Sequence, residues 1–134
     1  MKKEILLTLF LLSLSQNSTS AEKNCPTASG IARTDCLEKK IRSAESELKQ
    51  VLAKALSTIS AQDSSLIPAI ELENWRKNLI QSQRSWTTYK KTECEEITPY
   101  FWWGGSGATG AVLDCSLAKT EARIKELRER YNLN

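Results

Sequence analysis

The chain has 134 residues, of which 19 are Lys or Arg, 16 are Asp or Glu, and none is histidine. A compact domain commonly takes about 100 to 200 residues, so this length predicts one domain with a modest core. Without an imidazole, histidine-activated nucleophiles and zinc sites with histidine ligands are excluded. An enzyme of this composition would depend on carboxylates, lysine or tyrosine. We expect no enzyme activity, no metal and no cofactor.

The N-terminus is typical of a secretory signal peptide. Lys2 and Lys3 precede an apolar run at residues 5–14, which is too short to span a bilayer. Small residues at Thr19-Ser20-Ala21 predict cleavage after Ala21. Charged and polar residues precede Cys25 where a lipobox needs small or apolar ones, so we expect no membrane anchor. The mature protein is then periplasmic or secreted.

Residues 22–134 are the predicted mature domain. Removing 21 residues from 134 leaves 113, and the loss of Lys2, Lys3 and Glu4 leaves 17 basic and 15 acidic side chains. A net charge of +2 does not favour nucleic acid or an anionic membrane as a partner, because both require a clustered basic patch.

The four cysteines of the mature chain predict two disulfides, since export supplies an oxidising compartment. They are Cys25, Cys36, Cys94 and Cys115. No Cys-x-x-Cys pair is present, so a metal site is disfavoured. We favour nearest-neighbour pairing, Cys25 with Cys36 and Cys94 with Cys115. Four cysteines allow three connectivities, and the other two stay open.

Three stretches carry the apolar spacing of amphipathic helices. The first predicted helix is capped by Asp35, with Glu38 as its capping-box partner, and fades near Ser60. The second has Pro68 near its first turn and ends by Pro99. The third is capped by Asp114. The three apolar stripes are Leu37, Ile41, Ala44, Leu48, Val51 and Ala55; then Leu72, Trp75, Leu79, Ser82, Trp86 and Tyr89; then Leu117, Thr120, Ile124, Leu127 and Tyr131.

Short connections between three amphipathic helices predict an all-α fold, a small antiparallel three-helix bundle stapled by two disulfides. In this topology the start of the first helix, the end of the second and the start of the third lie at one pole. All four cysteines fall at that pole. Trp75 and Trp86, on the second stripe, are interpreted as core residues.

An unusual segment joins the second and third helices. Four consecutive aromatic residues are followed by a glycine-rich run, and the candidate binding residues are Tyr100, Phe101, Trp102, Trp103, Gly104, Gly105 and Ser106. Adjacent aromatics offer a broad contact surface of the kind enriched at interfaces, and they can stack on sugar rings. In the alternative interpretation they fold back over the open end of the bundle. Both interpretations can also hold together, with one tryptophan packed inside and one exposed.

Two other clusters are weaker candidates. Glu93, Glu95 and Glu96 could suggest the carboxylate pair of a glycosidase, but adjacent helical positions point in different directions, and a solvated face is the simpler interpretation. The glycine run lacks both a preceding strand and a Gly-Lys-Ser/Thr ending, so a phosphate loop is disfavoured.

The second half of the chain resembles the N-terminal domain family of LprI-type lysozyme inhibitors. The matching residues are Gln83, Arg84, Trp86 and Cys94, then Gly104-Gly105-Ser106, then Cys115, Thr120, Arg123 and Leu127. Upstream, Cys36 and Leu48 also match, while Lys49 and Leu52 stand where the family pattern has Asn and an aromatic residue. The resemblance implies a small exported helical domain, linked in some members to lysozyme inhibition.

Two functional hypotheses follow. In the first, the chain inhibits a lysozyme-like muramidase by placing the loop from Trp102 to Gly107 in or across its cleft, which needs no catalytic residue. Host lysozymes are typically basic, and a partner of charge +2 gains no long-range steering toward them. In the second, the chain is an envelope accessory or peptidoglycan-binding module whose aromatics stack on cell-wall glycan.

Overall fold

The computed structural model describes residues 24–27, 30–103 and 105–133. The chain forms α1 (Ile31–Ser60), α2 (Ala69–Lys91), a π-helix η2 (Thr92–Ile97), a 3-10 helix η3 (Thr98–Trp102) and α3 (Ala108–Tyr131), and the described residues contain no strand. The predicted all-α three-helix bundle is confirmed. The predicted signal peptide, residues 1–21, lies outside the described residues.

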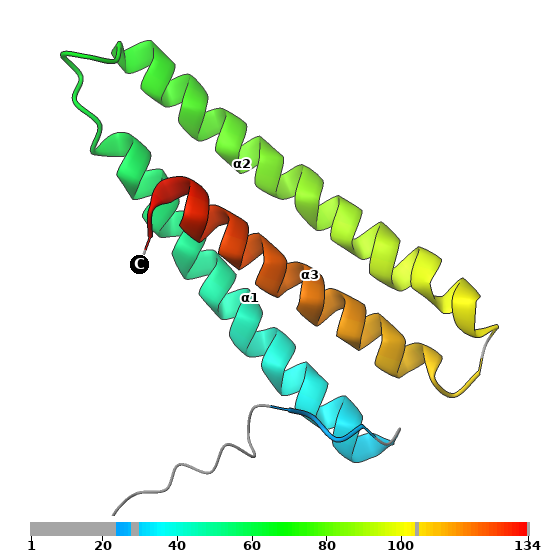
Figure 1. Cartoon of the computed structure of the whole chain (residues 1–134). Coiled ribbons are helices and arrows are strands. Elements are labelled where there is room, and N and C mark those ends of the chain that lie inside the picture. The colour runs from blue at the N-terminus through cyan, green and yellow to red at the C-terminus, as the bar shows by residue number, and fades with distance from the viewer. Residues whose placement is uncertain (1–23, 28–29, 104, 134) are drawn as a thin grey trace, which may run out of the picture.

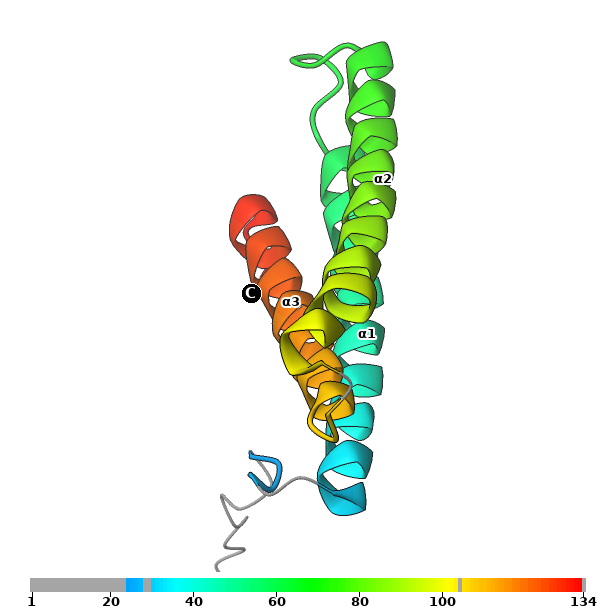
Figure 2. The same cartoon turned by 90° about the vertical axis from the view of Figure 1, so that its right-hand side faces the viewer.

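The helices run alternately up and down, so α2 is antiparallel to both α1 and α3 (Figure 1). The side view shows that the three helices pack unequally (Figure 2). Helix α3 crosses α1 at an angle. Helix α2 starts close to the end of α1, and its C-terminal end lies over α3. The most extensive packing is between α1 and α3. The bundle is therefore an α1–α3 pair with α2 laid against it.

The core follows the predicted stripe of α1. Its buried members are Leu37, Ala44, Leu48, Val51 and Ala55, with Ile59 one turn further. From α3, Ile124, Leu127 and Tyr131 complete the cluster. Burial of such side chains contributes roughly 1.5 to 3 kcal/mol each, so this apolar seam is the main source of stability.

The stripe of α2 is only partly buried, because α2 starts beyond the end of α3 and has fewer neighbours there (Figure 1). Leu79 is buried, and Trp86 packs against the core from the side. Trp75 is 41% exposed, so its interpretation as a core residue was wrong. It still has a partner on α3: its indole Nε1–H donates to the Tyr131 hydroxyl at 3.3 Å.

Both predicted aspartate caps are wrong. Helix α1 begins at Ile31 after Gly30, whose φ of 138° is one that L side chains rarely adopt. Helix α3 begins at Ala108, so Asp114 lies in its second turn. The side chain of Asp114 instead accepts a hydrogen bond and ion pair from Arg33 of α1. This long-range partner displaces the local capping role that the sequence suggested.

Two disulfides close the pole at which α1 and α3 begin. They join Cys25 to Cys36 and Cys94 to Cys115, the favoured pairing. Cys94 lies in the π-helix and is almost fully buried, while Cys115 lies in the second turn of α3. The second disulfide thus joins the two sides of the aromatic segment.

Candidate functional site

The four aromatics form the end of a continuous helical path rather than a loose loop. Tyr100, Phe101 and Trp102 belong to η3, and Trp103 follows with a left-handed backbone, φ 46°. Tyr100 is 72%, Phe101 78% and Trp103 91% exposed. The alternative in which the aromatics fold over the bundle is therefore wrong for these three. We call Tyr100, Phe101 and Trp103 the aromatic tip.

Trp102 takes a different position from its neighbours. Its six-membered ring lies so close to Gly107 that a Cβ added there would be 2.2 Å from a ring carbon. The carbonyl of Trp102 accepts a hydrogen bond from the Gly105 N–H at 2.8 Å, and a Cβ at position 105 would approach this oxygen to 3.0 Å. A side chain at 107 would therefore force the Trp102 ring to move, and one at 105 would press on the Trp102 carbonyl. Gly104, also a candidate, lies outside the described residues.

The base of the tip is well anchored. The Thr98 hydroxyl donates to the Glu93 carbonyl at 2.9 Å across the π-helix, and the Ala108 N–H donates to the Gly105 carbonyl at 3.0 Å. The disulfide between Cys94 and Cys115 ties both ends of this segment together. The exposed side chains therefore project from a segment whose backbone is held in place.

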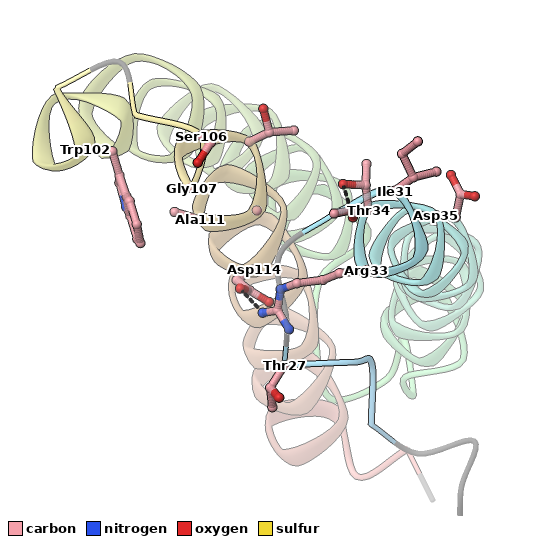
Figure 3. A pocket seen from close by; sticks show the side chains of 13 residues that line it. Thr27, Ile31, Arg33, Thr34, Asp35, Trp102, Ser106, Gly107, Ala111 and Asp114 are labelled. Carbon is pink, nitrogen blue, oxygen red and sulfur yellow. Dashed lines mark hydrogen bonds and ion pairs between the residues drawn. The ribbon is translucent and has the colours of Figure 1, made fainter.

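A groove opens beside Trp102, between the start of α1 and the start of α3 (Figure 3). Trp102 forms one side, Gly107 and Ala111 lie next to it, and the ion pair of Arg33 and Asp114 lies opposite. Arg33 is further held by its Nη1, which donates to the Pro26 carbonyl at 2.6 Å. The hydroxyl-bearing residues at the edge are Thr27, Thr34, Ser106 and Thr109.

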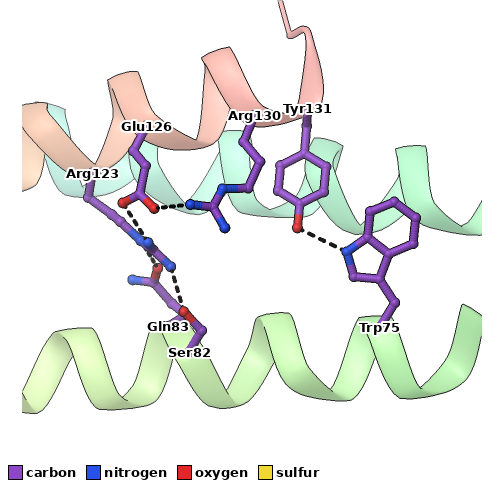
Figure 4. Close-up of polar contacts among 7 residues, drawn as sticks. All are labelled: Trp75, Ser82, Gln83, Arg123, Glu126, Arg130 and Tyr131. Atoms are coloured by element: carbon purple, nitrogen blue, oxygen red, sulfur yellow. Dashed lines mark hydrogen bonds and ion pairs between the residues drawn. The ribbon is translucent and has the colours of Figure 1, made fainter.

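Two further motif residues, Gln83 and Arg123, face each other between α2 and α3 (Figure 4). Arg123, 6% exposed, donates from Nε to Gln83 Oε1 at 3.1 Å and from Nη2 to the Ser82 hydroxyl at 3.2 Å. Its Nη1 forms an ion pair with Glu126 at 2.7 Å. These contacts satisfy a buried guanidinium, so the residues that make them hold the fold together.

Thr120 and Lys90 extend this polar contact toward the disulfide pole. Thr120 is fully buried, and its hydroxyl donates to the Ser116 carbonyl at 2.8 Å. Lys90 Nζ pairs with Glu45 of α1 at 2.9 Å and lies 5.5 Å from the centroid of the Trp86 ring. Trp86 thus has a structural place in the interface.

The comparison with known families decides the affiliation, because the model of the family described as lysozyme inhibitor LprI matches residues 21–127. The chain belongs to the lysozyme inhibitor LprI family. The match covers α1, α2, the aromatic segment and most of α3. Among curated proteins and solved structures, no match was found.

Membership in the LprI family supports a general role in lysozyme inhibition with a lysozyme as partner. The described residues hold no group of three or more side chains placed to bind a metal ion. Within the same residues, no helix is both long and apolar enough to cross a membrane.

The ion pair of Arg33 and Asp114 was not predicted from the sequence. The two lie 81 positions apart, and no local pattern links them. One signal was present, because Ala111, Val112 and Leu113 precede Asp114 without a proline and are compatible with a helix that begins upstream of Asp114. Gly110 was assigned to the loop because glycine is a poor helix former, so the first turn of α3 was not predicted.

Proposed function

We propose that this LprI family member is an exported inhibitor of lysozyme-like muramidases and that it contacts the enzyme through the aromatic tip. The observation that carries the proposal is the exposure of Tyr100, Phe101 and Trp103, which follow one another closely in the sequence of an anchored segment. Large neighbouring aromatics exposed to water are unusual in a monomer and are typical of interaction sites.

The anchoring of the tip favours tight binding. A loop that becomes ordered on association loses conformational entropy, and each immobilised side chain adds to that loss by about 0.5 to 1.5 kcal/mol. Here the disulfide between Cys94 and Cys115 and the turn at Gly105 restrict the backbone before any partner arrives. Aromatic side chains also have few rotatable bonds.

The charge near the tip supports a basic partner. Between Lys91 and Lys119 the chain carries four acidic residues and no basic one: Glu93, Glu95, Glu96 and Asp114. Glu95 and Glu96 are exposed on the π-helix next to the tip. The segment from residue 92 to 118 is negative although the whole mature chain is slightly positive, and since Asp114 is paired with Arg33, the unpaired charge comes from the three glutamates. This local field favours encounter with a basic lysozyme in the productive orientation.

Inhibition by occupation of the cleft is the proposed mechanism. A muramidase cleft holds sugar rings on either side of two carboxyl groups. Flat aromatic rings at the tip would fill the same kind of space as those sugar rings and so exclude the substrate. No proton transfer or covalent step is needed.

Export is part of the proposal. The signal peptide predicted at residues 1–21 would deliver the chain to the periplasm or outside the cell. The two disulfides support such an oxidising location, because they persist poorly in the cytosol.

A cell-wall lysis assay tests the function. Mature protein, residues 22–134, is mixed with a basic lysozyme before addition of a turbid cell-wall suspension. We expect the lysis rate to fall with added protein and to saturate near equimolar amounts when both are above the Kd. Undiminished lysis at a large molar excess of the mature protein over lysozyme would refute the proposal.

A further inference from the structure

The groove beside Trp102 is a second feature, separate from the aromatic tip. Trp103 is 91% exposed and free of the groove, whereas Trp102 is 48% exposed and forms one of its sides. In Figure 3 the Trp102 side chain lies beside Gly107 and Ala111, and the Arg33–Asp114 ion pair lies on the opposite side of the groove. The two neighbouring indoles therefore serve different surfaces.

Rigid polar groups form the other side of the groove. Arg33 is fixed by Asp114 and by the Pro26 carbonyl, and its side chain is 22% exposed against 46% for Asp114. The pair keeps unused hydrogen-bonding capacity, since a carboxylate has about four acceptor sites and a guanidinium five donors. The charges of Arg33 and Asp114 offset each other, and Asp35, which also lines the groove, adds one carboxylate. The groove therefore favours a neutral, hydroxyl-rich ligand over an anion.

The ligand that fits this combination is a sugar ring. A pyranose has an apolar face of C–H groups, which packs on an aromatic ring, and an equatorial rim of hydroxyls, each able to donate and accept. Trp102 offers the ring, Asp114 and Arg33 offer an acceptor and donors in fixed positions, and Thr34 and Thr109 add hydroxyls at the edge. The groove is open to solvent on one side and has a volume of about 820 Å³, room for a short saccharide.

We propose that the groove between the starts of α1 and α3 binds a pyranose ring of a neutral saccharide, with Trp102 as the stacking surface and Arg33 and Asp114 as the hydroxyl partners. The site goes beyond lysozyme inhibition and does not depend on it. A domain with both surfaces would hold cell-wall glycan at the groove while the tip remains available to a muramidase.

The experiment is an NMR titration of the ¹⁵N-labelled mature protein with chitotriose, and in a second arm with maltotriose, without lysozyme. We expect saturable shifts of the Trp102 indole N–H and of the amides near Ser106 and Gly110, with a Kd of about 1 mM or tighter. Saturation by chitotriose alone indicates an acetamido sugar, and saturation by both indicates general pyranose recognition. Either result supports the site.

Substitutions test which residues of the groove bind the saccharide. Trp102→Ala should weaken saccharide binding by about tenfold, the upper range for one aromatic contact. Asp114→Asn should also weaken it. Trp103→Ala is the matched control and should leave Kd within about twofold, because that side chain lies outside the groove. Since Trp102→Ala removes packing on Gly107, Trp102→Phe serves as a second variant that keeps a ring and should retain most of the binding.

No saturable shift with either sugar, or a loss equally large in Trp103→Ala, would overturn the proposal. Failure of this site is separable from failure of the inhibitor function. Wild-type protein that blocks lysis but binds neither sugar refutes the groove alone. Protein that binds sugar but never slows lysis refutes lysozyme inhibition alone.

Discussion

The Arg123 Nε–H donates a hydrogen bond to Gln83 Oε1 at 3.1 Å and so joins α3 to α2 in an interface that contains few buried apolar side chains (Figure 4). Both residues are among those that carry the family resemblance. Their position in the structure, between helices and away from the aromatic tip, indicates that this part of the motif specifies the fold.

Replacement of Arg123 by methionine should therefore lower the free energy of unfolding strongly. The change leaves Gln83 and Ser82 without their charged donor, and hydrogen bonds to charged groups are each worth roughly 1.5 to 3 kcal/mol. Because methionine retains apolar packing, we expect a net loss of about 2 to 3 kcal/mol in urea denaturation.

Arg130→Met is the matched control for this stability prediction. Arg130 also binds Glu126, at 2.9 Å, but its side chain is exposed, and exposed ion pairs contribute about 0 to 1 kcal/mol. Equal destabilisation by the two substitutions would contradict a special role for the buried guanidinium.

Gly107→Ala should displace the Trp102 ring. A Cβ at this position would lie 2.2 Å from a ring carbon, and the φ of −80° at Gly107 is one that alanine adopts easily, so the conflict is purely steric. We expect a shifted Trp102 indole resonance in the NMR spectrum and weaker binding of saccharide in the groove.

Gly110→Ala provides the comparison, because an added Cβ there meets only Arg33 Nε, at 3.8 Å, an ordinary contact. Within a helix this change should stabilise the protein by about 0.5 to 1 kcal/mol. If the Trp102 indole resonance has the same position in Gly107→Ala as in Gly110→Ala, the packing of Trp102 on residue 107 is refuted.

The core of α1 was predictable because its apolar stripe is a local pattern that one helix face must bury. The starts of α1 and α3 were not, whereas Pro68 does mark the start of α2, which begins at Ala69. The spacing around Asp35 and Asp114 favours local caps, but Asp114 binds Arg33, a partner that becomes visible only when α1 and α3 lie together. Likewise, the string from Tyr100 to Trp103 predicts a special segment without revealing which rings face water, because that depends on the turn at Gly105 and on the contact at Gly107.

Loss of the disulfide between Cys94 and Cys115 should affect both stability and inhibition. The bridge spans 21 positions, and the chain-entropy model assigns about 3 kcal/mol to a loop of that size. Because it also ties the base of the aromatic tip, the Cys94→Ser/Cys115→Ser variant should inhibit lysis less well per folded molecule.

The variant Cys25→Ser/Cys36→Ser is the comparison for that effect. Its bridge spans 11 positions and lies at the N-terminal side of α1, outside the tip. Thermal unfolding measures the loss of stability in each variant. The lysis assay, run below both melting temperatures, measures the loss of inhibition by folded protein. Inhibition that is lost equally in both variants would argue against anchoring of the tip by the bridge at Cys94.

The most direct test of the central claim is the inhibition constant of tip variants in the lysis assay. We expect Trp103→Ala to weaken inhibition by about 30-fold or more, as truncation of a central interface aromatic commonly does. The control is Leu66→Ala/Ile70→Ala, which removes two exposed apolar side chains at the opposite pole and should leave the inhibition constant unchanged. Full inhibition by the Trp103 variant, or an equal loss in the control, would contradict the account.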